Sequence, residues 1–281
     1  MCMHRIIDWN ELWKAIYASS PERVEKNRDP AAHWDKRAAA YHQATRDESG
    51  SAEWELEVME ITSGDTVLDM GAGTGRLAVP IARTAAHVTA LDPSAGMLSV
   101  LKGRMAAAGH TNYSCVQMRW EDTVIGRDIE PHDVVVAAFS LGFYDLAAAL
   151  EKFDAVARRA VYLFWHAGEW RSPGEMALYR TVFGEEAARQ KGYPDYIYPV
   201  NILHDAGIYP NVRIHHATRD TVYGSVEEAV QAWVAMHNPG MEELSPVRDY
   251  FARTLREDGA GKYVETTVRP TAAVWWEKEE K

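Results

Sequence analysis

A glycine-rich segment at residues 67–76, which reads VLDMGAGTGR, limits the folds that this chain can adopt. Its first residues are apolar and predict a buried strand, and the run from Leu77 to Ala82 predicts a helix. Glycines between a strand and a helix allow a sharp turn and the close approach of a ligand, because they lack a Cβ atom. The helix that follows offers unpaired N–H groups at its start. The segment therefore predicts a ligand site between a strand and a helix.

A second acidic residue indicates what this ligand contains. Residues 87–92 read HVTALD and predict a second strand that ends in Asp92. In doubly wound sheets, an acidic residue about 20 residues beyond the glycine turn accepts hydrogen bonds from a ribose. The turn and the acid together predict a site for a cofactor that carries adenosine.

The glycine spacing and Asp69 indicate which cofactor this is. The dinucleotide fingerprint has the spacing G-x-G-x-x-G and holds a pyrophosphate, whereas this turn has the spacing G-x-G-x-G. The carboxylate of Asp69, just before the first glycine, would repel a pyrophosphate and favours a cation. S-adenosylmethionine, which carries an ammonium and a sulfonium, is such a ligand. A nicotinamide-dependent oxidoreductase on the same kind of sheet is the alternative.

Composition excludes several classes of function. The net charge of −11 over 281 residues argues against general nucleic-acid binding, which needs clustered Lys and Arg. Cys2 and Cys115 provide neither a disulfide framework nor a metal-binding set. The sequence shows no signal-peptide core and no apolar run near the roughly 18 residues that span a bilayer. We expect a cytoplasmic protein that uses no metal, membrane or nucleic acid; a monomer and a homodimer both stay open.

The order of predicted elements indicates the fold class. Strands and helices alternate from Thr66 onward, which predicts a parallel sheet with helices on both faces. Strands are predicted at 66–70, 87–91, 113–117, 133–138 and 160–165, and helices at 75–84, 94–108 and 145–158. Residues 1–60 are predicted to be helical, with a loop at 46–51, and residues 61–166 to form the core. We predict an insertion or cap at 167–200. Residues 201–281 are predicted to complete the sheet, with strands at 211–218 and 264–277.

Further segments are similar to those of one family. Beyond the glycine turn they are LDPSAGML at 91–98, WED at 120–122, HDVVVAAFSL at 132–141 and WDKRAAAY at 34–41. With these segments, residues 34–168 resemble the class I S-adenosylmethionine (SAM)-dependent methyltransferases, particularly the type 11-like small-molecule group. The resemblance implies a Rossmann-like, doubly wound α/β sheet of seven strands, the last of them antiparallel beside the fifth. It also implies a helical N-terminal lid and an insertion after the fifth strand.

The resemblance implies an activity and a set of cofactor contacts. The activity is in-line transfer of a methyl group from SAM to a small molecule, with S-adenosylhomocysteine as product; a non-catalytic SAM-binding relative is the alternative. Asp69 would meet the ammonium of SAM and Asp92 both ribose hydroxyls. Trp120 would pack on the adenine, and Glu121, with Asp122 as an alternative, would accept from its amine. The remaining predicted cofactor contacts are Gly71, Ala72, Gly73, Gly75, Pro93, Met97, Phe139, Trp34 and Tyr41.

The acceptor side is less determined by the sequence. Residues 138–141, which read AFSL, differ from the N-P-P-Y type motif of relatives that methylate base amines, and this disfavours DNA or a glutamine amine as acceptor. A hydroxyl or thiol acceptor would be helped by a base, for which His166 and Tyr41 are the candidates. His42, Tyr144 and His166 are candidate substrate contacts. The many tryptophans and tyrosines outside the sheet predict either core and lid packing or an aromatic-lined pocket.

Overall fold

The computed structural model describes residues 7–44, 49–168, 172–190, 194–237, 239 and 244–278. The chain divides into two compact units that alternate along the sequence. Unit 1 consists of Met1–Trp165, Pro194–Ile214 and Ala272–Lys281, and unit 2 of His166–Tyr193 and His215–Thr271. Residues 167–200 and 201–281 each contribute to both units. Within 201–281, two long strands, Asn211–Tyr223 and Tyr263–Glu277, cross from one unit to the other.

One mostly parallel sheet carries the fold. Its strands lie in the order β3-β2-β1-β4-β5-β8-β6, and the pairs among the first five are parallel. They are β1 (Thr66–Met70), β2 (His87–Leu91), β3 (Tyr113–Val116), β4 (His132–Ala138), β5 (Ala157–His166), β6 (Asn211–Tyr223) and β8 (Tyr263–Glu277). The predicted α/β class and the place of the last strand beside the fifth are confirmed. The seven strands on this path match the predicted number, and the short β7 (Arg256–Glu257) lies off the path, where it pairs antiparallel with the start of β8.

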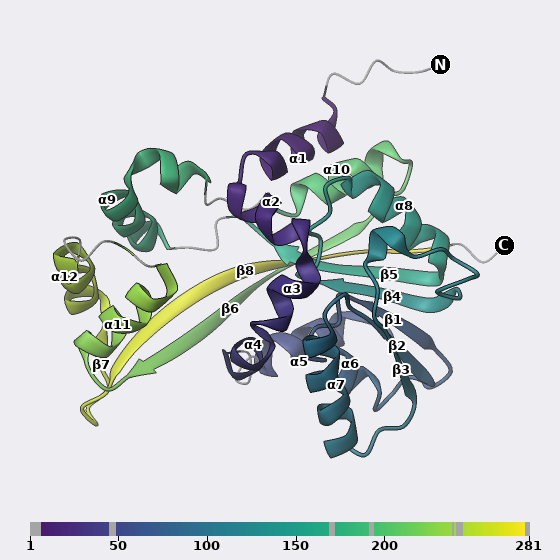
Figure 1. Ribbon diagram of the computed structural model, residues 1–281, viewed down its shortest axis with the longest axis horizontal. Coiled ribbons are helices and arrows are strands. Elements are labelled where there is room, and N and C mark those ends of the chain that lie inside the picture. Colours follow the sequence, from purple (N-terminus) through teal and green to yellow (C-terminus); the bar gives the residue numbers. More distant parts are fainter. Residues whose placement is uncertain are drawn as a thin grey trace. The chain divides into compact units, whose positions relative to one another are not determined.

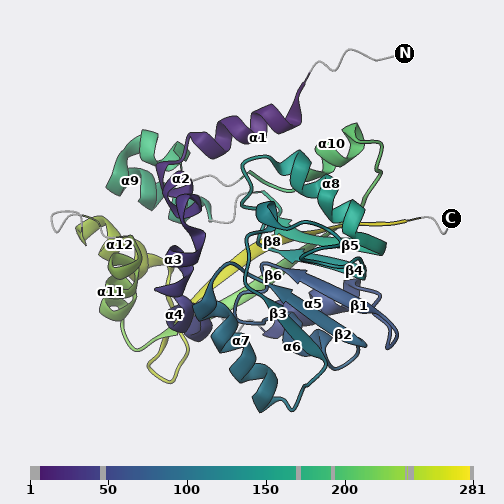
Figure 2. The ribbon, with the colours of Figure 1, turned by 45° about the vertical axis from the view of Figure 1, so that its right-hand side comes forward.

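Helices cover both faces of the sheet in unit 1 (Figures 1 and 2). Both views draw α8 (Leu146–Val156) and α10 (Ile197–Asp205) on one face, where these two helices contact each other. The other face carries α6 (Ala78–Ile81) and α7 (Ala95–Ala107). The helix predicted at 75–84 is thus only four residues long. Gly75 has φ of 79°, outside the helical range, so the chain is still turning there.

Five short helices precede the sheet. They are α1 (Trp9–Ala18), α2 (Pro21–Arg28), α3 (Pro30–Asp35), α4 (Ala38–Ala44) and α5 (Ser49–Val58). Of the predicted loop at 46–51, residues 49–51 belong to α5, and residues 46–48 lie outside the described residues. The Trp13 indole, which is buried, donates from Nε1 to the Phe143 carbonyl at 2.7 Å. The Ala147 N–H donates to Asn10 Oδ1 at 3.0 Å. Helix α1 therefore fixes the loop between β4 and α8.

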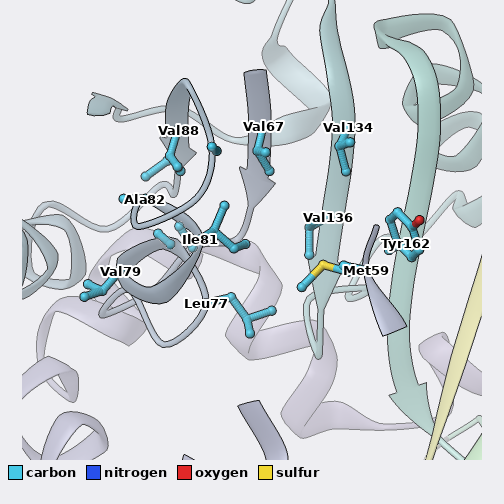
Figure 3. Packing of buried hydrophobic residues seen from close by; sticks show 14 of the residues in the cluster. Met59, Val67, Leu77, Val79, Ile81, Ala82, Val88, Val134, Val136 and Tyr162 are labelled. Carbon is cyan, nitrogen blue, oxygen red and sulfur yellow. The ribbon is translucent and has the colours of Figure 1, made fainter. Parts of the chain in front are cut away.

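The core lies between the sheet and the helices of one face (Figure 3). Figure 3 shows Val67, Val88 and Val134, from three neighbouring strands, which belong to one buried cluster with Ile81 of α6. Strands of a parallel sheet are covered on both faces, which is why β4 reads as a continuous apolar run, VVVAA. Each such side chain stabilises the fold by about 1.5–3 kcal/mol when fully buried. The packed strands give the loops at their ends fixed starting points.

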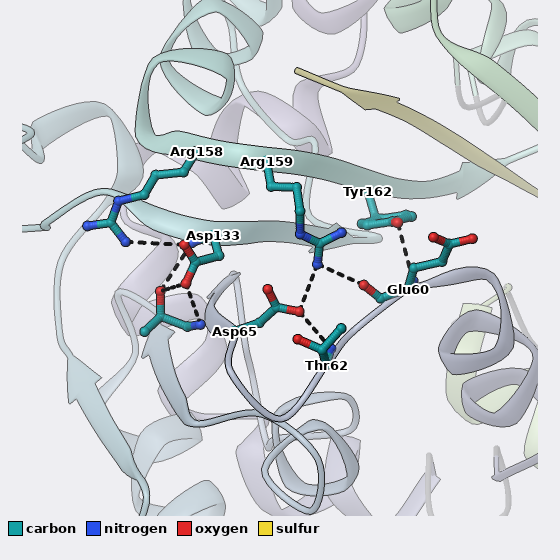
Figure 4. A network of polar contacts seen from close by, with 8 residues as sticks. Glu60, Thr62, Asp65, Asp133, Arg158, Arg159 and Tyr162 are labelled. Atoms are coloured by element: carbon teal, nitrogen blue, oxygen red, sulfur yellow. Dashed lines mark hydrogen bonds and ion pairs between the residues drawn. The ribbon is translucent and has the colours of Figure 1, made fainter. Parts of the chain in front are cut away.

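A polar network ties the strands together at their amino-terminal ends (Figure 4). Thr66 donates from its N–H and its Oγ1 to Asp133 Oδ2, at 2.8 and 2.7 Å. Arg159 donates to the Asp65 carboxylate at 2.7 Å and to the Glu60 carbonyl at 2.8 Å. These contacts join β1, β4 and β5 at the edge opposite to the glycine turn.

Unit 2 has a small core of its own. It contains α9 (Pro173–Gln190), α11 (Val226–His237) and α12 (Leu244–Thr254), and α12 contacts both other helices. The Phe183 ring stacks on the Trp233 ring with centroids 5.9 Å apart. The centroid of the Tyr179 ring lies 4.4 Å from that of the Phe183 ring. Because Tyr179 and Trp233 are buried, these aromatic side chains serve the core of unit 2. This is the first of the two roles predicted for such residues.

Candidate cofactor site

The glycine turn is anchored to the end of the neighbouring strand. Strands β1 and β2 end together, with Met70 paired to Leu91. The N–H groups of Gly71 and Ala72 both donate to the Leu91 carbonyl, at 2.8 and 3.0 Å. One residue further on, the Gly73 N–H donates to Asp92 Oδ2 at 2.9 Å. The two loops that carry the predicted cofactor residues are therefore one hydrogen-bonded unit.

The three glycines have different tasks. All have positive φ, at 71°, 53° and 79° for Gly71, Gly73 and Gly75, a conformation that favours glycine. A Cβ on Gly71 would lie 2.5 Å from the Ser140 Cβ, and a Cβ on Gly75 would lie 2.9 Å from Leu101. A Cβ on Gly73 would meet no atom nearer than the Gly71 carbonyl oxygen, at 3.9 Å. Gly71 and Gly75 thus allow packing inside the protein, whereas Gly73 has an open side where a ligand can approach.

Asp69 places a buried acceptor beside this turn. Its side chain is 3% exposed, and Oδ2 has no hydrogen-bond partner among the described residues. Burial raises the pKa of the Asp69 carboxyl to about 7; the Arg76 guanidinium opposes this rise and the Asp92 carboxylate adds to it. A buried carboxylate oxygen without a donor is costly, and a ligand ammonium would supply the missing donor. This atom therefore fits the amino group of SAM.

Asp92 is held rigidly at the end of β2. Its Oδ2 accepts from Gly73, and its Oδ1 accepts from the Ser94 N–H at 2.8 Å. Burial raises the pKa of Asp92, and these two N–H groups oppose that rise. Each carboxylate oxygen has a second lone pair, so both oxygens are still able to accept from the vicinal hydroxyls of a ribose. Pro93 and Met97 follow in the same loop and in α7, and Met97 is buried in the core.

Phe139 begins the loop after β4 in an uncommon conformation. It is the one described non-glycine residue with positive φ, at 53°, and its side chain is 39% exposed. Its N–H donates to the Phe164 carbonyl on β5 at 2.9 Å, and the Arg76 guanidinium carbon lies 5.7 Å from the ring centre. The adjacent Ser140 donates to the Met70 carbonyl at 2.9 Å. A strained residue at the end of a strand is typical of a functional site, and this loop packs directly on the glycine turn.

An ion pair that supports this turn was not predicted from the sequence. Arg76 donates to both carboxylate oxygens of Glu55, at 2.6 and 3.1 Å, and the Glu55 side chain is only 1% exposed. Because α5 and the glycine turn are separate segments, their residue spacing carries no signal of this pairing. The one available signal was a charged residue directly after the third glycine. The pair therefore holds the Arg76 guanidinium next to Asp69 and Phe139.

The N-terminal helices bring the predicted lid residues to α7. Both α3 and α4 pack against α7. The rings of Trp34 and Tyr41 contact each other edge to face, with centroids 5.5 Å apart, and His42 follows in α4. Asp35, next to Trp34, accepts hydrogen bonds from Ser94 and Gly96 at the start of α7. The structure therefore places the lid segment beside the loop that carries Asp92.

The predicted adenine contacts lie in different surroundings from those expected. Trp120 is 2% exposed; its ring stacks on Phe153 with centroids 4.9 Å apart, and Lys152 Nζ lies 4.7 Å from its centre. A ring buried in this way is a core residue, so the predicted packing of Trp120 on an adenine does not fit. Glu121 is exposed in the 3₁₀ helix Trp120–Asp122 and pairs with Arg119 at 3.1 Å. Its carboxylate stays accessible to a ligand amine.

The candidate acceptor residues belong to different elements of the chain. Tyr144, 56% exposed, contacts the ring of Tyr17 edge to face at 5.6 Å. His166 is the last residue of β5 and the first of unit 2. Burial lowers the pKa of His166 to about 4, and Arg269 adds to this effect. The ring is therefore uncharged at neutral pH. Among the described residues, no group of His, Cys, Asp and Glu could hold a metal ion.

Comparisons with known proteins identify the kind of domain that contains the glycine turn. Residues 67–160 match the family model of a methyltransferase domain. An uncharacterized protein of Haemophilus influenzae is 27% identical over 250 residues, which cover 88% of this chain and 89% of the relative. A solved structure from Bacillus halodurans, described as a candidate methyltransferase, superposes with a TM-score of 0.56 at 16% identity, covering 82% of this chain and all of that one. The YcgJ protein of Bacillus subtilis gives 0.52 at 14% identity, covering 83% and 99%.

Residues 67–160 therefore match a methyltransferase domain, and the chain shares its fold with the solved structure from Bacillus halodurans. The Asp69 oxygen that has no partner among the described residues and the open side of Gly73 fit SAM, the cofactor that the sequence predicts. In the part of the chain that the structure describes, no helix has the length and apolar character needed to cross a membrane.

Proposed function

We propose that this protein transfers the methyl group of SAM to a small-molecule acceptor. The observation that carries the proposal is the buried Asp69 Oδ2, which has no donor among the described residues and lies near the Asp92 carboxylate that accepts from the open Gly73. The amino group of the cofactor would bind Asp69, and its ribose would bind Asp92. The exposed Glu121 is the proposed partner of the adenine amine. When bound, SAM supplies an activated methyl group whose bond to sulfur breaks as the acceptor's lone pair attacks the methyl carbon.

The chain's own contribution to the reaction would be alignment and exclusion of water. Holding two reactants in line supplies about 7–11 kcal/mol of the barrier reduction. Phe139, with its fixed N–H and partly exposed ring, is the proposed wall beside the reacting centre. Trp34 and Tyr41 are the proposed lid over the cofactor, and such closure excludes water.

Proton transfer is proposed only for a hydroxyl or thiol acceptor. His166 is our first candidate for that step, because an uncharged imidazole can accept a proton at neutral pH. Its lowered pKa makes it a weak base, so it would act mainly by accepting a hydrogen bond from the acceptor. Tyr41 is the second candidate, and His42 and Tyr144 are proposed substrate contacts.

Calorimetry with SAM, S-adenosylhomocysteine and NADH tests the cofactor. We expect binding of the first two and none of NADH; the reverse result contradicts the proposal and supports the oxidoreductase alternative. Asp92→Ala should weaken SAM binding by about 10- to 100-fold, because charge-assisted hydrogen bonds are lost. Asp133→Ala is the matched control. It removes a carboxylate at the opposite edge of the sheet and should lower stability without changing affinity.

Transfer of a labelled methyl group tests catalysis. The protein is incubated with methyl-labelled SAM and, separately, with the small-molecule and the macromolecular fractions of a cell extract. We expect label in the small-molecule fraction. Label in the macromolecular fraction contradicts a small-molecule acceptor. Absence of transfer in both fractions, despite SAM binding, supports a non-catalytic SAM-binding relative.

A further inference from the structure

Asp35 at the end of α3 binds the beginning of α7 through two hydrogen bonds. Its Oδ1 accepts from the Ser94 hydroxyl at 2.6 Å and from the Gly96 N–H at 2.8 Å. Both donors lower the pKa of Asp35, so the carboxylate is charged at neutral pH. A negative charge near the first turn of a helix is also favoured by the helix dipole. These bonds are the polar part of the contact between α3 and α7.

The same serine connects Asp35 to the proposed ribose acceptor. The Ser94 N–H donates to Asp92 Oδ1 at 2.8 Å, while its hydroxyl donates to Asp35 and accepts from the Met97 N–H at 3.0 Å. Ser94 is fully buried. It is therefore fixed from three sides, and the orientation of the Asp92 carboxylate depends on it.

The approach of α3 to α7 requires the glycine at position 96. A Cβ there would lie 3.2 Å from the Asp35 Cα and 3.3 Å from the Asp35 carbonyl oxygen. Both are backbone atoms, which cannot move away as the end of a flexible side chain would. Gly96 is not one of the described glycines with positive φ. The lack of a side chain at this position therefore allows the contact with α3 and is not required by a turn.

We propose that Asp35 is a positioning residue for the cofactor: it holds α3 on α7 and, through Ser94, orients Asp92 toward the ribose. The proposal rests on the proposed SAM binding. In this proposal Asp35 acts on the cofactor through Ser94 and not by direct contact. Because Trp34 and Tyr41 belong to the segment that Asp35 anchors, loss of its bonds would release both lid residues and speed the departure of the cofactor.

Three variants test this proposal in the full-length protein with S-adenosylhomocysteine as the probe. Asp35→Ala removes both hydrogen bonds and should weaken binding about tenfold, chiefly through a faster dissociation rate. Asp35→Asn keeps an oxygen that can accept from Ser94 and Gly96, and should stay within about threefold of the unsubstituted protein. Gly96→Ala pushes α3 away and should resemble Asp35→Ala. Calorimetry gives the affinity, and stopped-flow tryptophan fluorescence gives the dissociation rate.

Asp29→Ala is the matched control. Asp29 caps α3 by accepting from the Ala32 N–H at 3.0 Å, so its loss weakens the helix without touching the bonds to α7. Unchanged binding in Asp35→Ala overturns the proposal, as does equal weakening by Asp35→Asn or by Asp29→Ala. Failure of the unsubstituted protein to bind S-adenosylhomocysteine is a different result, because it overturns the proposed function itself.

Discussion

Arg76 and Glu55 form a two-armed ion pair in the interior, with hydrogen bonds of 2.6 and 3.1 Å, directly beside Asp69. The pair brings one positive and one negative charge to a place that already holds the Asp69 carboxyl. It thereby links α5 to the glycine turn, and Arg76 further contacts the Phe139 ring. Each member therefore compensates the buried charge of the other.

Removal of one member should be far more harmful than removal of both. Glu55→Ala leaves a largely buried guanidinium without its counter-charge and should lower the free energy of unfolding by about 3–5 kcal/mol. The double variant Glu55→Ala with Arg76→Met should recover much of this loss. Denaturant unfolding measures both. A double variant as unstable as Glu55→Ala alone would show that the ion pair is not the cause.

Substitution of Gly73 and substitution of Gly71 should differ in their effects on SAM binding and on the stability of the fold. Gly73→Ala has space for its Cβ and should cost only about 1–2 kcal/mol for the positive φ, yet it should weaken SAM at least tenfold by filling the open side. Gly71→Ala should destabilise the protein more strongly, because its Cβ would collide with Ser140. Thermal unfolding and calorimetry distinguish the two effects. Undiminished SAM affinity in folded Gly73→Ala would place the ligand elsewhere.

Binding of the cofactor should depend on pH through Asp69. The pKa of about 7 means that this carboxyl is largely protonated below pH 7 in the unliganded protein, whereas an ammonium needs the ionised form. Affinity should therefore fall as pH decreases below 7, approaching about tenfold per pH unit. Calorimetry between pH 5.5 and 8 measures this. Asp69→Asn should bind weakly with a flatter pH dependence, and an equally steep one would assign the effect to another group.

Without ligand, the same carboxyl should affect stability in the opposite direction. Its folded-state pKa is raised above the unfolded value of about 3.9, so its stabilising contribution is complete below pH 4. That contribution is lost as the pH rises through 7.

His132 should make the protein sensitive to acid. The ring is buried, with Nε2 2.7 Å from Thr89 Oγ1 and Nδ1 2.7 Å from the Glu130 carbonyl oxygen, and burial lowers its pKa. The unfolded chain therefore takes up the proton first, below a pH of about 6.5. Stability from this group is complete above that pH and is lost as the pH falls toward the lowered folded-state pKa.

The check is the unfolding free energy of the unsubstituted protein and of His132→Gln across pH 5–8. We expect the difference between the two proteins to shrink on acidification, because glutamine does not titrate. A difference that is constant over this range would exclude His132 as the source.

The sheet and the cofactor loops were predictable because their signals are local. The run from Val67 to Gly75 predicts a strand and a turn and contains the acidic residue within one segment. The continuous apolar run of β4 predicts a strand that is buried on both faces. Asp35, Ser94, Glu55 and Arg76 were not recognised, because their contacts join residues 21 to 61 positions apart and leave no periodic pattern. The surroundings of Trp120 differ from the prediction for another reason. Its position after β3 matched the family, but tertiary packing on Phe153 decided where its ring lies.

The division of the chain into two units has a consequence for its evolution. Unit 2 consists of two stretches, each of which leaves unit 1 and returns to it. The proposed contacts to the methyl donor all lie within residues 34–139, so both stretches can diverge, lengthen or be exchanged while the donor chemistry is preserved. Sequence differences among relatives should therefore concentrate at residues 166–193 and 215–271.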